Sequence, residues 1–365
     1  MRAHYKQNCD QLTFWSIVDL CSNGFRIILK IVFLFVILES TLLVASDEKK
    51  SILWEAELGD FDQDYFFQVD RLLKAFESER GIALKPSVIG KVGLKLDTRA
   101  GAGLSTPKGL IKGVIQALEL RGFLREQIFL VDYSMHQLKE ADFYELNGHM
   151  AQFEGCPVYA LDAFEFFDEL WFYDNPVPPI SKQGLVEAMG GRPKWLKKDS
   201  DFNTRKSYLP MPLMFGCDFW INLAVCMDDP ILGLDGALAN ASIWNVSNQW
   251  RFLLDSSTAS VAVAEILAIP EVNERLILNI LSLESYQFIG GPDFNALYSR
   301  SLPIVWMSDD PVAIDRYCLN LVNKERRKNG FDELSIRNLQ LLYASNLGLG
   351  SFDLQRIKKR QLKKD

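Results

Sequence analysis

VGLKLDTRAGAGLSTPKGLIKGVIQALELRG, residues 92–122, contains a strand, a turn and a helix, and it decides the fold class. Its first part, Val92–Leu96, is short and apolar apart from Lys95, as expected of a buried strand. Apolar residues then recur at helical spacing over residues 110–120, and Gly122 is a typical residue for a helix end. The stretch therefore predicts the repeating unit of an α/β protein.

The turn inside this stretch is rich in small residues. Two glycines can adopt backbone angles that a Cβ atom disfavours, while Thr106 is placed to cap the helix, with Pro107 at its first position. Because the free amides of a helix N-terminus attract anions, the turn is a candidate ligand site. Its candidate residues are Gly101, Gly103, Ser105 and Thr106. The alternative is that the glycines only allow the chain to turn tightly.

Further apolar segments extend the pattern. A second buried strand, Gln127–Val131, follows the helix, and a strand, a helix and a strand this close in sequence form a right-handed unit with a parallel pair. Two later runs, Phe219–Cys226 and Leu302–Met307, are also predicted strands, and Phe61–Glu79 is predicted to form an amphipathic helix. We predict an α/β fold with a mostly parallel central sheet flanked by helices.

Each of the four predicted strands is followed by aspartate. If the strands are parallel, these ends share the edge at which open α/β sheets bind ligands. Neighbouring strands lie about 4.8 Å apart, so carboxylates there could share one Mg²⁺ or Ca²⁺ ion. The candidate metal ligands are Asp97, Asp132, Asp228 and Asp309. Lys95 and Arg99 flank the first of them and are candidates for holding an anionic substrate.

Some aspartates near these ends have a purely structural alternative. Asp229 and Asp310 each precede a proline, which suits a helix N-cap. Asp315 falls in the first turn of a predicted helix, where the helix dipole alone favours a negative charge. No G-x-S-x-G motif surrounds the serines at the strand ends. The residues thus indicate a ligand site and leave the reaction open.

Composition excludes several classes of protein. The chain has 365 residues, of which 48% are hydrophobic, and its formal net charge of −7 argues against a nucleic-acid partner. None of its six cysteines forms a C-x-x-C pair, which argues against a zinc ribbon, and we expect no iron–sulfur cluster. The four cysteines after residue 46 could be buried thiols or, in an exported chain, disulfides. They are Cys156, Cys217, Cys226 and Cys318.

The first 46 residues are typical of a targeting segment. The apolar run Ile31–Leu38 is too short to span a bilayer, and it lies between the basic residues Arg26 and Lys30 and the small residues 44–46. This predicts a signal peptide cleaved near Ser46 and export to the periplasm or the extracellular space. The alternative is an uncleaved anchor, which would be the chain's one route to a membrane.

The rest of the chain is predicted to be a single α/β domain over residues 47–350. An irregular excursion is expected at about residues 164–212, because the prolines of Asn175–Pro179 cannot continue a helix or a central strand. Residues 351–365 are rich in lysine and arginine and are predicted to form a basic, solvated tail.

Several stretches, taken in order, resemble the family called domain of unknown function 362. The most specific is DPVAID, Asp310–Asp315. The others are the Lys95 strand with Ser105–Pro107, Asp132, Gly236–Asn240, Gly290–Pro292, Ser308–Asp309 and Leu347–Gly350. The resemblance covers roughly residues 84–350 and implies an α/β fold. We add Asn240, at the end of one matching stretch, to the candidate ligand-binding residues.

The chain departs from this family in two places. Members often carry a lysine and a histidine where this chain has Met227–Pro230, and some carry ferredoxin-like cysteine clusters that this sequence lacks. The resemblance therefore implies a cluster-free, exported variant, and a redox role does not carry over to it.

The expected function is that of an enzyme acting on a small anionic or phosphorylated compound at the carboxyl edge of the sheet, assisted by a divalent cation. One alternative is a non-catalytic exported protein that binds such a ligand. Another is a membrane-associated interaction protein that uses the N-terminal segment and the basic tail. Carboxylates that converge would favour the enzyme, and helix caps that face apart would favour the alternatives.

Overall fold

The structure is a computed structural model that describes residues 51–59, 65–148, 150–163, 165–177 and 205–362. The predicted signal peptide or anchor lies outside these ranges, as does the middle of the predicted excursion. Among the described helices, none is long and apolar enough to cross a membrane.

A mixed sheet of ten strands forms the centre of the described chain. In spatial order its strands are β16 (Ile357–Gln361), β1 (Ser51–Glu57), β15 (Ile304–Ser308), β12 (Leu276–Ser282), β9 (Phe219–Ala224), β2 (Val92–Lys95), β3 (Ile128–Asp132), β6 (Cys156–Ala160), β5 (Met150–Phe153) and β4 (Glu145–Asn147). The five strands from β12 to β6 are parallel to one another. The predicted α/β fold with a mostly parallel sheet is confirmed.

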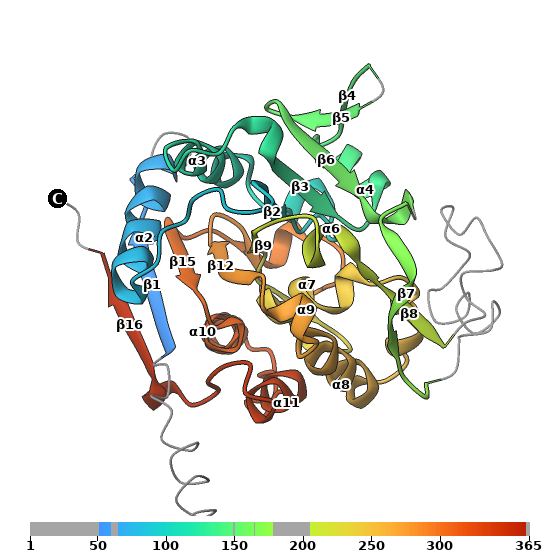
Figure 1. Cartoon of the computed structure of the whole chain (residues 1–365). Helices are drawn as coiled ribbons and strands as arrows, with labels where there is room; N and C mark the ends of the chain where they lie inside the picture. Colours follow the sequence, from blue (N-terminus) through green and yellow to red (C-terminus); the bar gives the residue numbers. More distant parts are fainter. Residues whose placement is uncertain (1–50, 60–64, 149, 164, 178–204, 363–365) are drawn as a thin grey trace, which may run out of the picture. The chain divides into compact units, whose positions relative to one another are not determined.

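Helices cover both faces of this sheet (Figure 1). They are α2 (Tyr65–Arg80), α3 (Lys108–Glu119), α4 (Met135–Glu140), α6 (Met211–Met214), α7 (Ala237–Ala241), α8 (Ser256–Leu267), α9 (Pro270–Asn273), α10 (Pro311–Lys328) and α11 (Leu339–Asn346). Two apolar cores result, one between the sheet and α2 and α3, the other between the sheet and α7, α8, α10 and α11. Neighbouring strand residues alternate between them, so Leu130 is in the first core and Val131 in the second. Burial on both faces explains why the central strands are almost continuously apolar.

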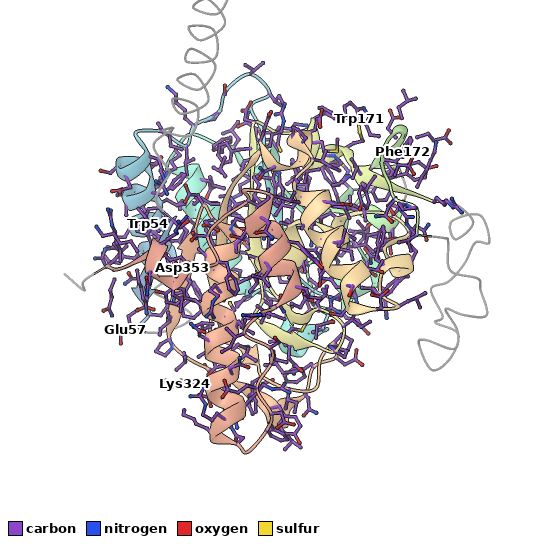
Figure 2. The ribbon with its side chains drawn as sticks, turned by 90° about the horizontal axis from the view of Figure 1, so that it is seen from below. Trp54, Glu57, Trp171, Phe172, Lys324 and Asp353 are labelled. Atoms are coloured by element: carbon purple, nitrogen blue, oxygen red, sulfur yellow. The ribbon has the colours of Figure 1, made fainter. Side chains whose placement is uncertain are left out.

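Two smaller sheets complete the described chain. One contains β10 (Met227–Asp229), β11 (Gly233–Asp235), β13 (Tyr286–Gln287) and β14 (Ser299–Arg300). The other is the ribbon of β7 (Phe167–Asp174) and β8 (Lys206–Pro210), within the segment that the sequence predicts to be irregular. Figure 2 shows Trp171 and Phe172 of this ribbon on the far side of the molecule from Trp54 and Glu57 of β1.

Two parts of the sheet differ from the sequence predictions. First, β15 is antiparallel to both of its neighbours, β12 and β1. Second, the predicted basic tail contributes the edge strand β16, which pairs in parallel with β1. Lys359 Nζ lies 2.6 Å from Glu55 Oε2, and Arg360 Nη1 lies 2.6 Å from Glu79 Oε2. Acidic side chains therefore compensate two charges of the segment that was predicted to be a solvated tail.

Candidate functional site

The candidate site is built around the residues that follow β2 at the carboxyl edge of the parallel strands. Gly101 has a φ of 82°, in the region that favours glycine, and its amide donates to the carbonyl of Thr98. Gly103 has a different reason to be glycine, because a Cβ atom there would lie 2.2 Å from the ring of Phe294. Both glycines thus have a structural role in the turn, and Ser105 is half-buried beside them.

Thr106 does not cap the helix, so that prediction is wrong. The cap position of α3 belongs to Pro107, and no side chain caps it. Instead the Thr106 hydroxyl accepts a hydrogen bond from the Asp97 amide at 2.8 Å and donates one to the Leu223 carbonyl at 2.6 Å. Thr106 therefore joins the end of β2 to the neighbouring strand β9, a contact between residues far apart in sequence.

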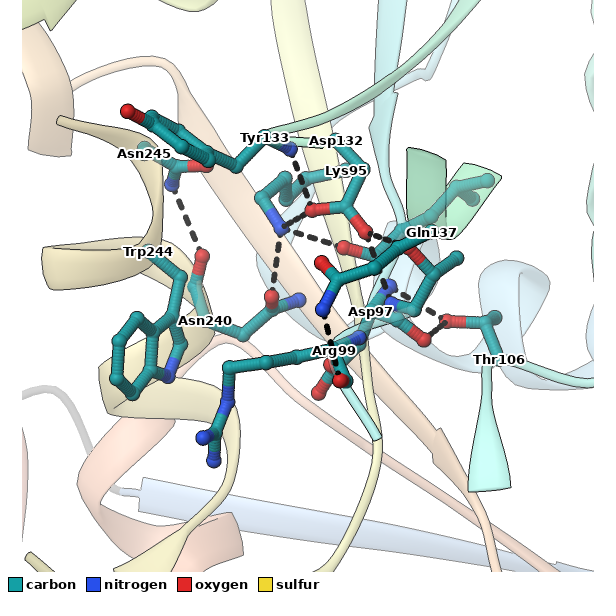
Figure 3. Close-up of polar contacts among 12 residues, drawn as sticks. Lys95, Asp97, Arg99, Thr106, Asp132, Tyr133, Gln137, Asn240, Trp244 and Asn245 are labelled. Carbon is teal, nitrogen blue, oxygen red and sulfur yellow. Dashed lines mark hydrogen bonds and ion pairs between the residues drawn. The ribbon is translucent and has the colours of Figure 1, made fainter. Parts of the chain in front are cut away.

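Lys95 and Asp132 form a buried ion pair between β2 and β3 (Figure 3). The Lys95 ammonium donates to Asp132 Oδ1 at 2.7 Å, to Asn240 Oδ1 at 2.6 Å and to the Leu96 carbonyl at 2.5 Å. Since an ammonium has three protons, all its donors are used. Lys95 is also fully buried, so it holds the site together and offers no free donor to a substrate in this structure.

Asp132 is equally well satisfied. Besides Lys95, its Oδ1 accepts from the Tyr133 amide at 2.7 Å, and its Oδ2 accepts from the amide and the hydroxyl of Thr98 at 2.8 and 2.6 Å. These four bonds occupy about all the acceptor positions of a carboxylate. A metal ion at Asp132 would have to displace one of them.

A ladder of asparagines continues from Lys95 across the sheet. Asn240 donates to Asn222 at 2.8 Å, and Asn222 donates to Asn279 at 2.9 Å. Lys95, Asn222 and Asn279 are register partners on β2, β9 and β12, and all are buried. Asn222 and Asn279 are not among the site residues predicted from the sequence. A polar residue in the middle of each apolar run, FWINLA and LILNILS, was the available signal.

Arg99 belongs to a second cluster of charged side chains at the same edge. Its guanidinium donates to Asp235, lies 3.4 Å from Asp229, and stacks over the ring of Trp244 at 4.3 Å. Trp244 Nε1 in turn donates to Asp235 at 2.9 Å. Burial opposes the charge of Arg99, but Asp235 and Asp229 outweigh it and raise the pKa of the guanidinium. Asp235 and Trp244 lie on segments that no motif marked.

Asp97 is the carboxyl group of this site with the weakest hydrogen bonding. It is 2% exposed and accepts long bonds, from the Val225 amide at 3.2 Å and from the Arg99 amide at 3.5 Å. Burial, with the nearby charge of Asp235, raises the pKa of Asp97 to about 7. Asp97 therefore exchanges a proton near neutral pH.

Asp228 lies beside this cluster and stabilises a turn. Its carboxylate accepts from the amides of Gly290 and Gly291, each at 3.1 Å, and Arg326 lies 3.7 Å away. Its neighbour Asp229 ends strand β10 and accepts from the amides of Ile231 and Leu232, so the prediction that Asp229 caps a helix is wrong.

Asp309 does not join the other predicted metal ligands. Because β15 is antiparallel, its chain runs away from that edge, and Arg80 binds both Asp309 oxygens at 2.8 and 2.9 Å. Asp310, by contrast, caps α10 as predicted and accepts from the Ala313 amide at 2.8 Å. Asp315 accepts from the amides of Ala237 and Leu238 at the start of α7.

The described residues include few side chains that could bind a metal ion or act as a reactive thiol. In the part of the chain that the structure describes, no three His, Cys, Asp or Glu side chains are placed to hold one metal ion. Cys156, Cys217, Cys226 and Cys318 are all free and buried, and burial raises the pKa of the Cys156 and Cys217 thiols to about 12.

Comparisons with known proteins add little to this geometry. No family model and no curated protein matches the chain. Among solved structures, it is similar to the crystal structure of a Thermotoga maritima protein that was a structural-genomics target. The identity is 12% and the TM-score 0.38, and the match covers 75% of this chain but only 60% of that one. The resemblance to domain of unknown function 362 stays a prediction.

Proposed function

We propose that this chain is an exported enzyme that acts on a small anionic or phosphorylated compound at the carboxyl edge of its sheet, with a divalent cation assisting. The observation that carries the proposal is Asp97, a buried and poorly hydrogen-bonded carboxyl group with a pKa of about 7. A strongly perturbed group inside a cluster of charges is a mark of functional sites.

The number of buried charges supports a role beyond stability. The site combines four carboxyl groups with two cations, and replacing buried ion pairs by apolar residues is often neutral or stabilising. The carboxyl groups, all buried, are Asp97, Asp132, Asp229 and Asp235, and the cations are the buried Lys95 and the partly buried Arg99. A fold that needed only stability would gain little from burying them.

The charge balance explains why a cation is part of the proposal. With all groups ionised, four negative and two positive charges leave an excess of two negative charges, which would repel a bare anion. Mg²⁺ would offset it, and this ion usually binds one or two protein carboxylates together with water and substrate phosphate oxygens. Asp97 is the best placed carboxylate for such a role, since the bonds of Asp132 are complete.

A second candidate is a non-catalytic exported protein that binds the same class of ligand. It is favoured by the complete hydrogen bonding of Lys95 and Asp132, which makes this part of the site rigid. Both candidates include export, which is a proposal because residues 1–46 lie outside the described chain. The two candidates differ in whether the bound compound is converted.

The test is a thermal-shift and calorimetric titration of the chain with Mg²⁺ alone, phosphate alone, and both together. We expect the combination to raise the melting temperature most, and Asp97→Asn to abolish that increment. Asp142→Asn is the matched control, because Asp142 is exposed and lies on another segment, paired with Lys108. No shift in any titration, or equal shifts in wild type and Asp97→Asn, would contradict the proposal. Release of phosphate from a phosphate ester would then separate enzyme from binding protein.

A further inference from the structure

A cavity lies at the amino edge of the parallel strands, opposite the site of Asp97. Its volume is about 580 Å³, within the usual range for small-molecule pockets. Segment 82–89, which precedes β2, forms one wall, while Phe219 of β9 and Ile277 of β12 belong to the other. The cavity is therefore formed where three neighbouring parallel strands begin.

Exposed aliphatic side chains line this cavity. Val88 is 97% exposed, Ile82 44% and Ile89 37%. Apolar surface contributes roughly 25 cal/mol to binding for each Å² that a ligand removes from water. Single exposed aliphatic residues are ordinary, but three around one cavity provide a wall for the apolar part of a ligand.

Two cations with unused donors lie beside this apolar wall. Within the described residues, no hydrogen bond or ion pair engages the Lys85 ammonium. The Arg275 guanidinium makes one hydrogen bond, from Nη1 to the carbonyl of Cys217, which leaves the rest of its donors open in the described chain. An arginine fork with free donors is suited to a carboxylate.

The one acidic residue of the lining is already engaged. The Asp218 carboxylate accepts hydrogen bonds from three backbone amides, those of Ser87 at 2.7 Å, Ile89 at 2.8 Å and Gly90 at 2.9 Å. Two cations and one carboxylate give the cavity a net charge of +1, although the whole chain carries −7. The cavity is thus complementary to a monoanion with an apolar body.

We propose that this cavity binds a free amphipathic carboxylate. The carboxylate group lies between Lys85 and Arg275, and the apolar chain covers the aliphatic wall formed by residues 82–89. This site is separate from the one proposed around Asp97 and does not depend on its function.

The experiment is isothermal titration calorimetry on the full chain with octanoate, and with 1-octanol and acetate as probes that lack the charge or the apolar chain. We expect octanoate to bind at least tenfold more tightly than either. Lys85→Met and Arg275→Met should each weaken octanoate at least fivefold. The control Lys358→Met, which removes an exposed lysine of β16, should leave its affinity unchanged.

A second variant, Val88→Asp, tests the proposal even if the Lys85 or Arg275 variants fail to fold. Val88 is almost fully exposed, so Val88→Asp should fold normally while its carboxylate repels octanoate. Absence of octanoate binding, or equal affinity in wild type, Lys85→Met and Val88→Asp, would overturn the proposal. Binding to phosphatidylglycerol vesicles without binding to octanoate would also overturn it, in favour of a membrane contact.

Discussion

Lys95 Nζ and Asp132 Oδ1 lie 2.7 Å apart between two parallel strands, and both side chains are buried. This pair joins two central strands of the sheet and is also part of the candidate site. Lys95 also anchors Asn240 of α7, so one ammonium joins β2, β3 and a helix that follows much later in the chain.

We expect Lys95→Met to destabilise the protein strongly. It leaves the Asp132 carboxylate buried without its cation, and breaking a buried pair typically costs about 3–5 kcal/mol. Urea unfolding measures the change in the free energy of unfolding. Lys108→Met is the control, because the exposed pair of Lys108 with Asp142 contributes roughly 1 kcal/mol or less. Similar losses in the two variants would show that the buried pair has no special role.

The pH dependence of stability should reveal Asp97. Its pKa is raised from 3.8 to about 7 on folding, so the folded state binds the proton more tightly than the unfolded state. The resulting penalty is absent below pH 3.8, grows as the pH rises towards 7, and is constant above it. Stability should therefore fall between about pH 4 and pH 7. Asp97→Asn should reduce this slope and, at pH 8, stabilise the protein by up to about 4 kcal/mol.

Asp315 has to be measured alongside Asp97, because burial also raises its pKa to about 7. Asp97→Asn should thus remove part of the slope and leave the part that Asp315 contributes. Chemical unfolding at several pH values gives the comparison. If Asp97→Asn retains the full wild-type slope, Asp97 does not titrate in this range.

Gly103 should tolerate a side chain only when Phe294 is shortened. A Cβ atom at residue 103 would lie 2.2 Å from the Phe294 ring, so we expect Gly103→Ala to cost about 1–3 kcal/mol. Phe294 is 40% exposed, so Phe294→Ala alone should cost less than truncating a core phenylalanine. In a double-mutant cycle, Phe294→Ala should recover most of the loss. If the losses of the two single variants simply add in the double variant, the backbone at residue 103, and not the Phe294 ring, restricts this position.

Arg99 and Asp235 should behave as a coupled pair. Arg99→Met leaves the Asp235 carboxylate, which is fully buried, facing only Trp244 Nε1, and should cost about 3–5 kcal/mol. Asp235→Asn in the same chain removes the uncompensated charge and should restore a large part of the stability. Thermal unfolding of the single and double variants measures the coupling. A double variant as unstable as the sum of the single ones would contradict it.

The local sequence predicted the parallel unit of β2, α3 and β3 because its cues act within about 40 residues. Apolar runs mark buried strands, helical spacing marks α3, and their proximity requires a parallel pair. That the ends of β2 and β3, with Asp97 and Asp132, share one edge followed from this connectivity. The N-cap role of Asp310 could also be predicted from the local sequence, because the cap and the first turn are adjacent along the chain.

Tertiary structure alone decided where the other charges are compensated. The antiparallel direction of β15 directs Asp309 away from the site and to Arg80, and pairing with β1 makes the basic tail the strand β16. Asp235, which binds Arg99, is 136 residues away from it in the sequence. The sequence by itself determined which residues are charged and which strands are buried. Which charges meet was decided by long-range packing, because an ion pair depends on distance in space and not on spacing along the chain.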